Sequence, residues 1–233
     1  MASFPARETA LGATVRSVID QVGALHVYLN GYSHVPACLA HPRVAVYRSQ
    51  EAAGDILDTG KFWASDKATE YFITLDDDLI YPPDYVSVLV SGIERYGRQR
   101  ICTFHGRSFA KFPIHSYYRA PLHRLVRCLG GLEEDRSVQF GGTGVMGMHV
   151  STLRPRLQDF GAHGMTDVWM GIAAATHRIP IMALAHRAGW ITEAPEPATQ
   201  SSIYVRNKHH DTVQTATVNA HAALFSPRAQ GST

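Results

Sequence analysis

Hydrophobic positions along the chain follow two patterns, short continuous apolar runs and longer segments with an apolar residue at every third or fourth position. The short runs predict strands, and the longer segments predict amphipathic helices. Strands are expected at residues 1–4, 25–30, 44–47, 71–75, 100–106 and 179–185. Helices are expected at residues 8–21, 82–97 and 167–178, with a weakly patterned one at 212–224.

Strand and helix patterns follow one another repeatedly. Thr9 suits the cap of the first helix, Pro82 and Pro83 suit the first turn of the second, and Gly97 suits its end. Repeated strand–helix units are typical of a parallel or mainly parallel sheet with helices on both faces. The expected fold class is therefore α/β, with a mainly parallel central sheet flanked by helices.

The chain of 233 residues is long enough to bury a sizeable core, and one large domain at residues 1–194 is expected. Its composition, 45% hydrophobic and 18% charged, is typical of ordered globular proteins. Residues 98–136 are rich in basic and aromatic side chains and are expected to form an insertion or long loop over the site. Residues 195–233 are expected to form a loosely attached, partly flexible tail.

The formal net charge of +2 is too small to indicate a nucleic-acid partner, and none is expected. Cys38, Cys102 and Cys128 are far apart and odd in number, which favours reduced thiols over disulfides or a zinc site. The chain shows no signal-peptide pattern and no apolar run near the ~20 residues that span a bilayer. We expect a cytoplasmic protein that reaches a membrane only through a partner or a basic surface.

Three aspartates, Asp76, Asp77 and Asp78, follow directly on the apolar run of residues 71–75. In parallel sheets ligands bind beyond the carboxyl ends of the strands, which is where these side chains fall. Burying an unpaired carboxylate is costly, and adjacent like charges add to the cost. A Mg²⁺ or Mn²⁺ ion would offset the charge and leave coordination positions for a substrate phosphate. Alternatively, Asp77 or Asp78 caps the next helix or faces solvent in a turn.

Two glycine-containing segments are candidates for contact with a nucleotide sugar. In the first, a glycine is followed at once by a lysine, although the P-loop pattern is absent. In the second, bare backbone would let a sugar and its diphosphate approach. Each segment is equally compatible with an ordinary loop or a tight turn. The candidate residues are Asp58, Gly60 and Lys61 in the first segment and Gly142, Thr143 and Gly144 in the second.

Two single residues are further candidates. Asp167 opens a predicted helix, where it could act as a general base toward an incoming hydroxyl or cap its own helix. His186 follows a predicted strand and could be a metal ligand, although a lone histidine beside apolar residues is more often structural.

Basic residues interleaved with aromatic ones fill the region after the strand at 100–106. Such a stretch suits an acidic glycan acceptor, with sugar stacking on the aromatic rings, and it also suits a solvated loop. The basic residues are Arg107, Lys111, Arg119, Arg124 and Arg127, and the aromatic ones are Phe109, Tyr117 and Tyr118. The candidate acceptor-binding residues are His105, Arg107 and Arg119.

Seven short segments occur in one order along the chain: MASFPAR (1–7), LNGYSHVP (29–36), DTGKF (58–62), DDDLIYPPDYV (76–86), HG (105–106), GTG (142–144) and DV (167–168). Together they resemble the GT-A glycosyltransferases of the family-2-like nucleotide-sugar type, and within these the capsular heparosan α-N-acetylglucosaminyltransferases. The aspartate-rich segment is the specific one. The short glycine pieces carry little weight alone.

The resemblance implies a single Rossmann-like GT-A domain with a nucleotide-binding half at residues 1–104 and an acceptor and catalytic half at 105–194. It implies that Asp78 binds Mn²⁺ or Mg²⁺, and that Asp76, with Asp77 beside it, lies near the ribose or uracil. It also implies that the nucleotide is bordered by Ser3, Pro5, Arg7 and Asn30, and reached by Lys61. His186 departs from the family pattern.

The activity implied is transfer of a sugar, N-acetylglucosamine, from a UDP-sugar to a growing surface or capsular polysaccharide or a similar, acidic glycan acceptor. Asp167 would be the base if the anomeric configuration inverts, and would orient the acceptor or donor sugar if it is retained. The implied partners are the UDP-sugar, the glycan acceptor and another polysaccharide-synthesis protein or domain at the inner face of the membrane.

Two other classes of function remain open. A metal-dependent phosphohydrolase or nucleotidyltransferase would use the three aspartates for two cations and needs a second acid cluster facing the first. The acids available for such a cluster are Asp55, Asp58 and Asp167. A non-catalytic nucleotide-sugar or glycan-binding module of a larger synthase is the third class, although the intact triple aspartate argues against it.

Overall fold

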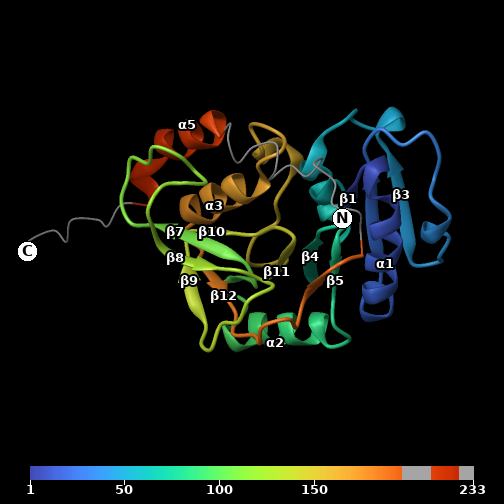
Figure 1. Ribbon diagram of the computed structural model, residues 1–233, viewed down its shortest axis with the longest axis horizontal. Helices are drawn as coiled ribbons and strands as arrows, with labels where there is room; N and C mark the ends of the chain where they lie inside the picture. The colour runs from blue at the N-terminus through green and yellow to red at the C-terminus, as the bar shows by residue number, and fades with distance from the viewer. Residues whose placement is uncertain (196–210, 226–233) are drawn as a thin grey trace, which may run out of the picture.

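The computed structural model describes residues 1–195 and 211–225 of a mixed α/β domain (Figure 1). In these residues, no helix is both long and apolar enough to cross a membrane. The α-helices are α1 (Glu8–Val18), α2 (Tyr85–Arg95), α3 (Thr166–Thr176) and α5 (Thr212–Ala220). Short 3₁₀ helices connect them: η1 (Pro5–Arg7), η2 (Ile19–Gln21), η3 (Ala37–Leu39), η4 (Ser49–Glu51), η5 (Leu57–Phe62), η6 (Ser65–Lys67), η7 (Leu157–Asp159) and η8 (Ala222–Leu224).

A small parallel sheet forms one side of the molecule. Its strands are β1 (Ala2–Ser3), β2 (Leu25–Leu29) and β3 (Val44–Arg48). Strand side chains alternate between faces, so β2 directs Val27 and Leu29 toward the core that α1 shares and Tyr28 toward a separate cluster.

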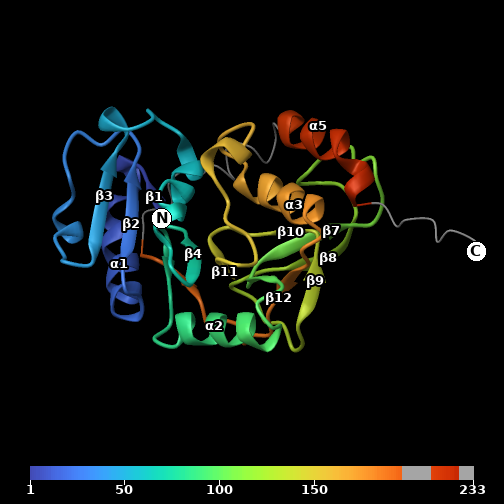
Figure 2. The ribbon, with the colours of Figure 1, turned by 180° about the vertical axis from the view of Figure 1, so that it is seen from behind.

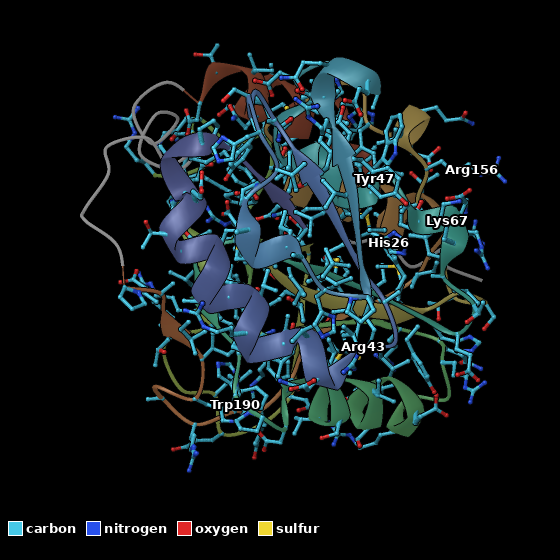
Figure 3. All side chains as sticks on the ribbon, turned by 90° about the vertical axis from the view of Figure 1, so that its right-hand side faces the viewer. His26, Arg43, Tyr47, Lys67, Arg156 and Trp190 are labelled. Atoms are coloured by element: carbon cyan, nitrogen blue, oxygen red, sulfur yellow. The ribbon has the colours of Figure 1, made fainter. Side chains whose placement is uncertain are left out.

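The partner strands β2 and β3 are also joined by side chains. His26 and Tyr47 lie next to one another in Figure 3, with the imidazole Nδ1 3.0 Å from the phenol oxygen. The three parallel strands place their carboxyl ends together, beside the N-terminus of α1.

The larger sheet is mixed. Its order is β4–β11–β6–β12–β9, with β4 at Tyr71–Leu75, β6 at Ile101–Thr103, β9 at Arg136–Val138, β11 at Val145–His149 and β12 at Ile181–Ala183. Only β6 and β12 pair in parallel, because β11 lies antiparallel between β4 and β6. The central sheet was expected to be mainly parallel, but this sheet is mixed. The pattern prediction missed β11 because its sequence VMGMH is short and lies in a glycine-dense stretch.

The basic region expected to be a loop is partly a hairpin. Strands β7 (Gly106–Phe109) and β8 (Leu122–Val126) pair antiparallel, and β7 also pairs with β10 (Phe140–Gly141). A further antiparallel pair, β5 (Leu79–Ile80) with β13 (Thr192–Glu193), has its strand β5 next to α1. The strand predicted at 100–106 thus ends early, and its last residue begins β7.

Besides the small cluster around Tyr28, three larger buried clusters hold these elements together. Leu89 and Ile93 of α2 belong to the cluster shared with α1 and β2, while Met170 and Ala174 of α3 pack on the other face of the mixed sheet. The third cluster joins α3 to α5 through the fully buried Val218. Figure 2 shows α5 beside α3, on the opposite side of the molecule from the parallel sheet.

Most predicted elements are confirmed. The strands expected at 1–4, 25–30, 44–47, 71–75 and 179–185 are found as β1, β2, β3, β4 and β12. The four expected helices are found as α1, α2, α3 and α5. Of the expected tail, residues 211–225 are described and pack on α3, whereas 196–210 and 226–233 lie outside the described residues.

Asp135 joins the end of α2 to the segment after β12. Its carboxylate accepts hydrogen bonds from the Ala185 amide (2.7 Å), the Tyr96 hydroxyl (2.7 Å) and the Arg95 guanidinium (2.5 Å). Burial alone would raise the pKa of Asp135, but these donors outweigh it and the pKa is lowered. Asp135→Ala should lower the free energy of unfolding at pH 7 by about 1–3 kcal/mol, because donors are left unpaired.

The pH dependence of that loss follows from the direction of the shift. A carboxyl group with a lowered folded-state pKa stabilises the protein above its unfolded pKa of about 3.9, and this contribution disappears as pH falls through the folded value. Urea unfolding of wild type and Asp135→Ala should therefore differ most near neutrality and converge in acid. A difference that is constant with pH would contradict the assignment.

Candidate active site

A cavity of about 720 Å³ opens where the two sides of the molecule meet. Its walls come from the carboxyl ends of β1, β2 and β4, from the turn that precedes β11, and from the N-terminus of α3. Figure 1 shows these elements converging between α1 and α3. Segments that are far apart in the sequence thus contribute to one hollow.

Most of the sequence-predicted site residues line this cavity. They are Ser3, Pro5, Arg7, Asn30, Asp58, Lys61, Asp76, Asp77, Asp78, His105, Arg107, Gly142, Thr143, Gly144 and Asp167. Residues from both predicted halves of the domain are among them. Those not in its lining are Gly60, Arg119 and His186.

Asp76 is the first of the three aspartates and is paired with Lys61. The Lys61 ammonium, only 7% exposed, contacts the Asp76 carboxylate. Burial would lower the pKa of Lys61, but the carboxylates of Asp76, Asp58 and Asp167 outweigh this effect and raise it. Lys61 is therefore a fixed positive charge in the cavity wall.

Tyr81 fixes the backbone of the aspartate turn. Its hydroxyl accepts a hydrogen bond from the Asp76 amide (2.9 Å) and donates one to the Gly144 carbonyl (2.7 Å). The ring is buried against Tyr85. Sequence reasoning missed Tyr81, whose only signal is its position just before Pro82 and Pro83.

Gly144 is required by the Asp76 carboxylate. A Cβ atom at position 144 would lie 1.9 Å from Oδ2 of Asp76, which no side chain can accommodate without displacement. Gly142 has a similar relation to His105, because its Cβ would come within 2.8 Å of that side chain. The glycines predicted to receive a ligand thus also make room for two candidate side chains.

Asp78 is paired with Arg7 from the other side. The Arg7 guanidinium lies 2.8 Å from Oδ2 of Asp78, and its side chain is 10% exposed. The turn η1, which begins at Pro5, brings this arginine from the end of β1 to the cavity. The two outer aspartates, Asp76 and Asp78, are therefore each paired with a cation from a different loop.

Asp77, between them, is buried. Its Oδ2 has no hydrogen-bond partner within the described part of the chain. Loss of hydration on burial raises the pKa of Asp77 to about 7, although a hydrogen bond from Ser3 and the charge of Arg7 oppose the shift. The three carboxylates are thus not equivalent: two are paired with cations, and the middle one is desolvated.

Asp58 links the cavity floor to α3. Its carboxylate accepts hydrogen bonds from the Gly164 amide (2.8 Å), the Thr166 amide (3.1 Å) and the Thr166 hydroxyl (2.7 Å). These donors stand at the start of α3, where unpaired amides favour a negative charge. Asp58 therefore positions the helix that carries Asp167.

Asp167 does not cap its own helix. Its Oδ1 accepts hydrogen bonds from the amide and the hydroxyl of Thr143, both at 2.7 Å. The Thr143 hydroxyl also lies 2.8 Å from that of Thr166. Asp167 is thereby held at the cavity wall, against the turn that contains Gly142 and Gly144.

His105 lies between β6 and β7, and Arg107 lies on β7. Burial lowers the pKa of His105, against the opposing charge of Asp167. The Arg107 guanidinium lies over the rings of Tyr117 and Tyr118, at 4.6 and 5.3 Å from their centroids, and donates to the Tyr117 carbonyl. These residues form a wall that is both cationic and aromatic.

The remaining nucleotide-side candidates brace the cavity. The Asn30 amide group donates to the Leu57 carbonyl (3.0 Å), and its oxygen accepts from the Ile56 amide (3.1 Å). The Ser3 hydroxyl lies 3.0 Å from that of Tyr32. These bonds fix the loop before Lys61 against the ends of β1 and β2.

Three predicted residues lie elsewhere. A Cβ at Gly60 would meet the Tyr28 ring at 2.8 Å, so this glycine serves close packing. The Arg119 Nε–H donates to the Ser116 hydroxyl (3.4 Å). His186 lines a separate hollow, with Nδ1 2.8 Å from the Leu184 carbonyl, and so is not brought to the aspartates.

Within residues 1–195 and 211–225, no group of three or more His, Cys, Asp or Glu side chains is arranged to hold a metal ion by itself. No protein-family model and no curated protein sequence matches the chain.

A prediction follows from Tyr81. Tyr81→Phe removes a hydroxyl that is bonded on both sides, while the Asp76 amide and the Gly144 carbonyl keep their mutual bond of 3.2 Å. The free energy of unfolding should therefore fall by about 0.5–1.5 kcal/mol. The matched control is Tyr85→Phe, because the buried Tyr85 hydroxyl has no hydrogen-bond partner in the described residues. That variant should be neutral or more stable than wild type in chemical denaturation. Equal losses in both variants would contradict the role given to Tyr81.

Proposed function

We propose that the protein is a metal-dependent glycosyltransferase of the GT-A type. In this proposal it transfers a sugar, N-acetylglucosamine, from a UDP-sugar to a growing surface polysaccharide or a similar glycan. The observation that carries the proposal is that one cavity brings together three aspartates, the two cations Lys61 and Arg7 that pair with the outer two, and Asp167. The resemblance of the DDDLIYPPDYV segment to that family supports the same activity.

The donor's diphosphate would lie beside the outer aspartates. Arg7 and Lys61 are buried cations at that point, and phosphate oxygens attract such groups strongly. The uridine would extend toward Ser3 and Asn30 at the ends of β1 and β2. The glycine turn at 142–144 leaves backbone open to the cavity for the sugar.

The donor set fits a hard divalent cation. The side chains of Asp76 and Asp78 are 40% and 34% exposed, and between them the buried Oδ2 of Asp77 has no hydrogen-bond partner in the described residues. Mg²⁺ and Mn²⁺ are commonly held by one or two carboxylates and completed by substrate phosphates. Asp78 would be the principal ligand. A cation bound there would neutralise the charge that grows on the departing diphosphate.

The chain's own residues would supply positioning and proton transfer. Asp58 and Thr143 hold Asp167 in place, so its carboxylate is oriented before substrate arrives. If the anomeric configuration inverts, Asp167 accepts the proton of the attacking hydroxyl. If it is retained, Asp167 orients one of the two sugars. The His105 and Arg107 side chains, beside Tyr117 and Tyr118, would contact the sugars.

The decisive experiment is a binding and turnover assay with UDP-sugars. Wild type with Mn²⁺ should be stabilised thermally by UDP and by UDP-N-acetylglucosamine, and should hydrolyse the latter slowly. Asp78→Asn should weaken Mn²⁺-dependent UDP binding about tenfold or more, because a metal-binding oxygen is lost. Asp20→Asn, which changes a carboxylate 84% exposed and paired with Arg43, is the matched control and should bind like wild type.

Other results would point to the other classes. Absence of UDP-sugar binding, together with metal-dependent release of phosphate from nucleoside triphosphates or p-nitrophenyl phosphate, would favour a phosphohydrolase or nucleotidyltransferase. Binding of a UDP-sugar without hydrolysis or transfer to any offered glycan would favour a binding module.

A second prediction concerns Asp167. Asp167→Asn keeps an oxygen that can accept the Thr143 hydrogen bonds but removes the negative charge. If Asp167 accepts a proton, turnover should fall about 10²-fold or more while the dissociation constant of UDP stays near that of wild type. A variant with wild-type turnover would exclude a role for that charge, and NMR analysis of the product would then assign the stereochemistry.

A further inference from the structure

The helix α5 is joined to the cavity wall by the carboxylate of the residue that precedes it. Asp211, at the N-terminus of α5, makes no side-chain cap to its own helix. Instead its Oδ2 accepts hydrogen bonds from the Ser116 hydroxyl (2.6 Å) and the Tyr118 amide (2.8 Å). Asp211 is only 6% exposed, so these bonds are shielded from water.

Two more residues of α5 bind the same segment. The Thr215 hydroxyl oxygen accepts from the Tyr117 amide (3.0 Å). Asn219 makes a paired contact with Ile114, accepting from its amide (2.8 Å) and donating to its carbonyl (2.7 Å). Residues 211, 215 and 219 are spaced four apart and therefore lie on one face of the helix. That face forms hydrogen bonds with the backbone of residues 114–118.

The segment held in this way is part of the cavity. Tyr117 and Tyr118 line it, and Arg107 lies over both rings. Gln214, the residue before Thr215 in α5, also lines the cavity and is 6% exposed. A helix about a hundred residues later in the sequence thus fixes one wall of the candidate active site.

The bonds to Asp211 are charge-assisted. Burial would raise the pKa of Asp211, but the Ser116 hydroxyl, the Tyr118 amide and the nearby Arg119 outweigh it and the pKa is lowered. The group is therefore a carboxylate at neutral pH, and hydrogen bonds to an ionised acceptor are stronger than those between neutral groups.

We propose that Asp211 and Thr215 are positioning residues, which hold Tyr117 and Tyr118 in the orientation that binds the sugar of the donor. The inference rests on the proposed function. It assigns the diphosphate end of the donor to Arg7, Lys61 and the aspartates, and the transferred sugar to the wall that α5 holds. Loss of the clamp should therefore weaken binding of the sugar and spare binding of UDP.

The test uses the full chain with Mn²⁺ and two probes, UDP and UDP-N-acetylglucosamine. Asp211→Ala removes the acceptor, and Thr215→Val removes the second acceptor with little change in shape. Asp211→Asn keeps an oxygen in place and is the conservative rescue. Asp135→Ala is the matched control, because Asp135 is also a carboxylate bonded to a main-chain amide and a hydroxyl, but it lies just before β9, outside the lining of the cavity.

Calorimetry should show that Asp211→Ala and Thr215→Val weaken UDP-N-acetylglucosamine binding about tenfold while the dissociation constant of UDP changes by less than about twofold. Asp211→Asn should recover most of the loss, and Asp135→Ala should bind both probes like wild type. Hydrogen exchange should accelerate at the Tyr117 and Tyr118 amides in Asp211→Ala and not in Asp135→Ala.

Three outcomes would overturn the proposal: unchanged sugar binding in both α5 variants, equal weakening of UDP, or the same effect in Asp135→Ala. If Asp211→Ala does not fold, Thr215→Val decides by the same criteria. If wild type binds neither probe, the proposed function has failed. Slow exchange at Tyr117 and Tyr118 that is unchanged in Thr215→Val would then overturn the clamp independently.

Discussion

Three adjacent carboxylates at the end of a buried strand are the constraint around which the rest of the site is built. Each of them needs a different compensation, because like charges cannot be desolvated together. Lys61 from η5 contacts the first and Arg7 from η1 the third, while the second is buried with a raised pKa. The loops that deliver these two cations come from opposite sides of the turn, so the parallel sheet and β4 must stand side by side.

The same constraint extends to residues without charge. The first carboxylate leaves no room for a Cβ at Gly144, and the turn that carries it is closed by the buried hydroxyl of Tyr81. On the far side, Asp58 and Asp167 join the floor, the glycine turn and α3 in one hydrogen-bonded chain. A change at any of these points would disturb the aspartates, because the loss of one member of a buried polar network leaves its partners unpaired at a cost in stability.

Local signals in the sequence were sufficient for elements whose pattern is long or sharply bounded. Helices α1, α2 and α3 and the strands of the parallel sheet follow from apolar spacing and from proline and glycine at their ends. Strand β11 was missed because five residues with a central glycine carry little periodicity, yet its antiparallel insertion decides the character of the mixed sheet. Pairing between distant strands is a tertiary property that such short patterns do not encode.

The candidate site also has one part that the sequence predicts and one part that it does not. The aspartates, Lys61 and the glycine turn could be predicted, because their chemistry is visible in single segments. The contacts of Asp58 with Thr166 and of Asp211 with Tyr118 could not, because each joins residues about a hundred positions apart. His186 shows that a residue with suitable chemistry can still lie away from the site. A histidine after a strand has the chemistry of a ligand, but the chain directs its ring toward the Leu184 carbonyl and away from the aspartates.

The balance of charge in the cavity determines how the donor and the metal would bind under the proposed activity. The cations nearest the aspartates already face carboxylates, so a bare diphosphate would bring additional negative charge to a site with no surplus positive charge among these pairs. Asp78 would hold a divalent cation, which would add positive charge where the diphosphate binds. Arg7 could then turn part of its hydrogen bonding toward the phosphates without leaving the aspartate unpaired. Under the proposed function, donor and metal would therefore bind cooperatively, and the ion pairs of Arg7 and Lys61 would hold the acids apart before both bind.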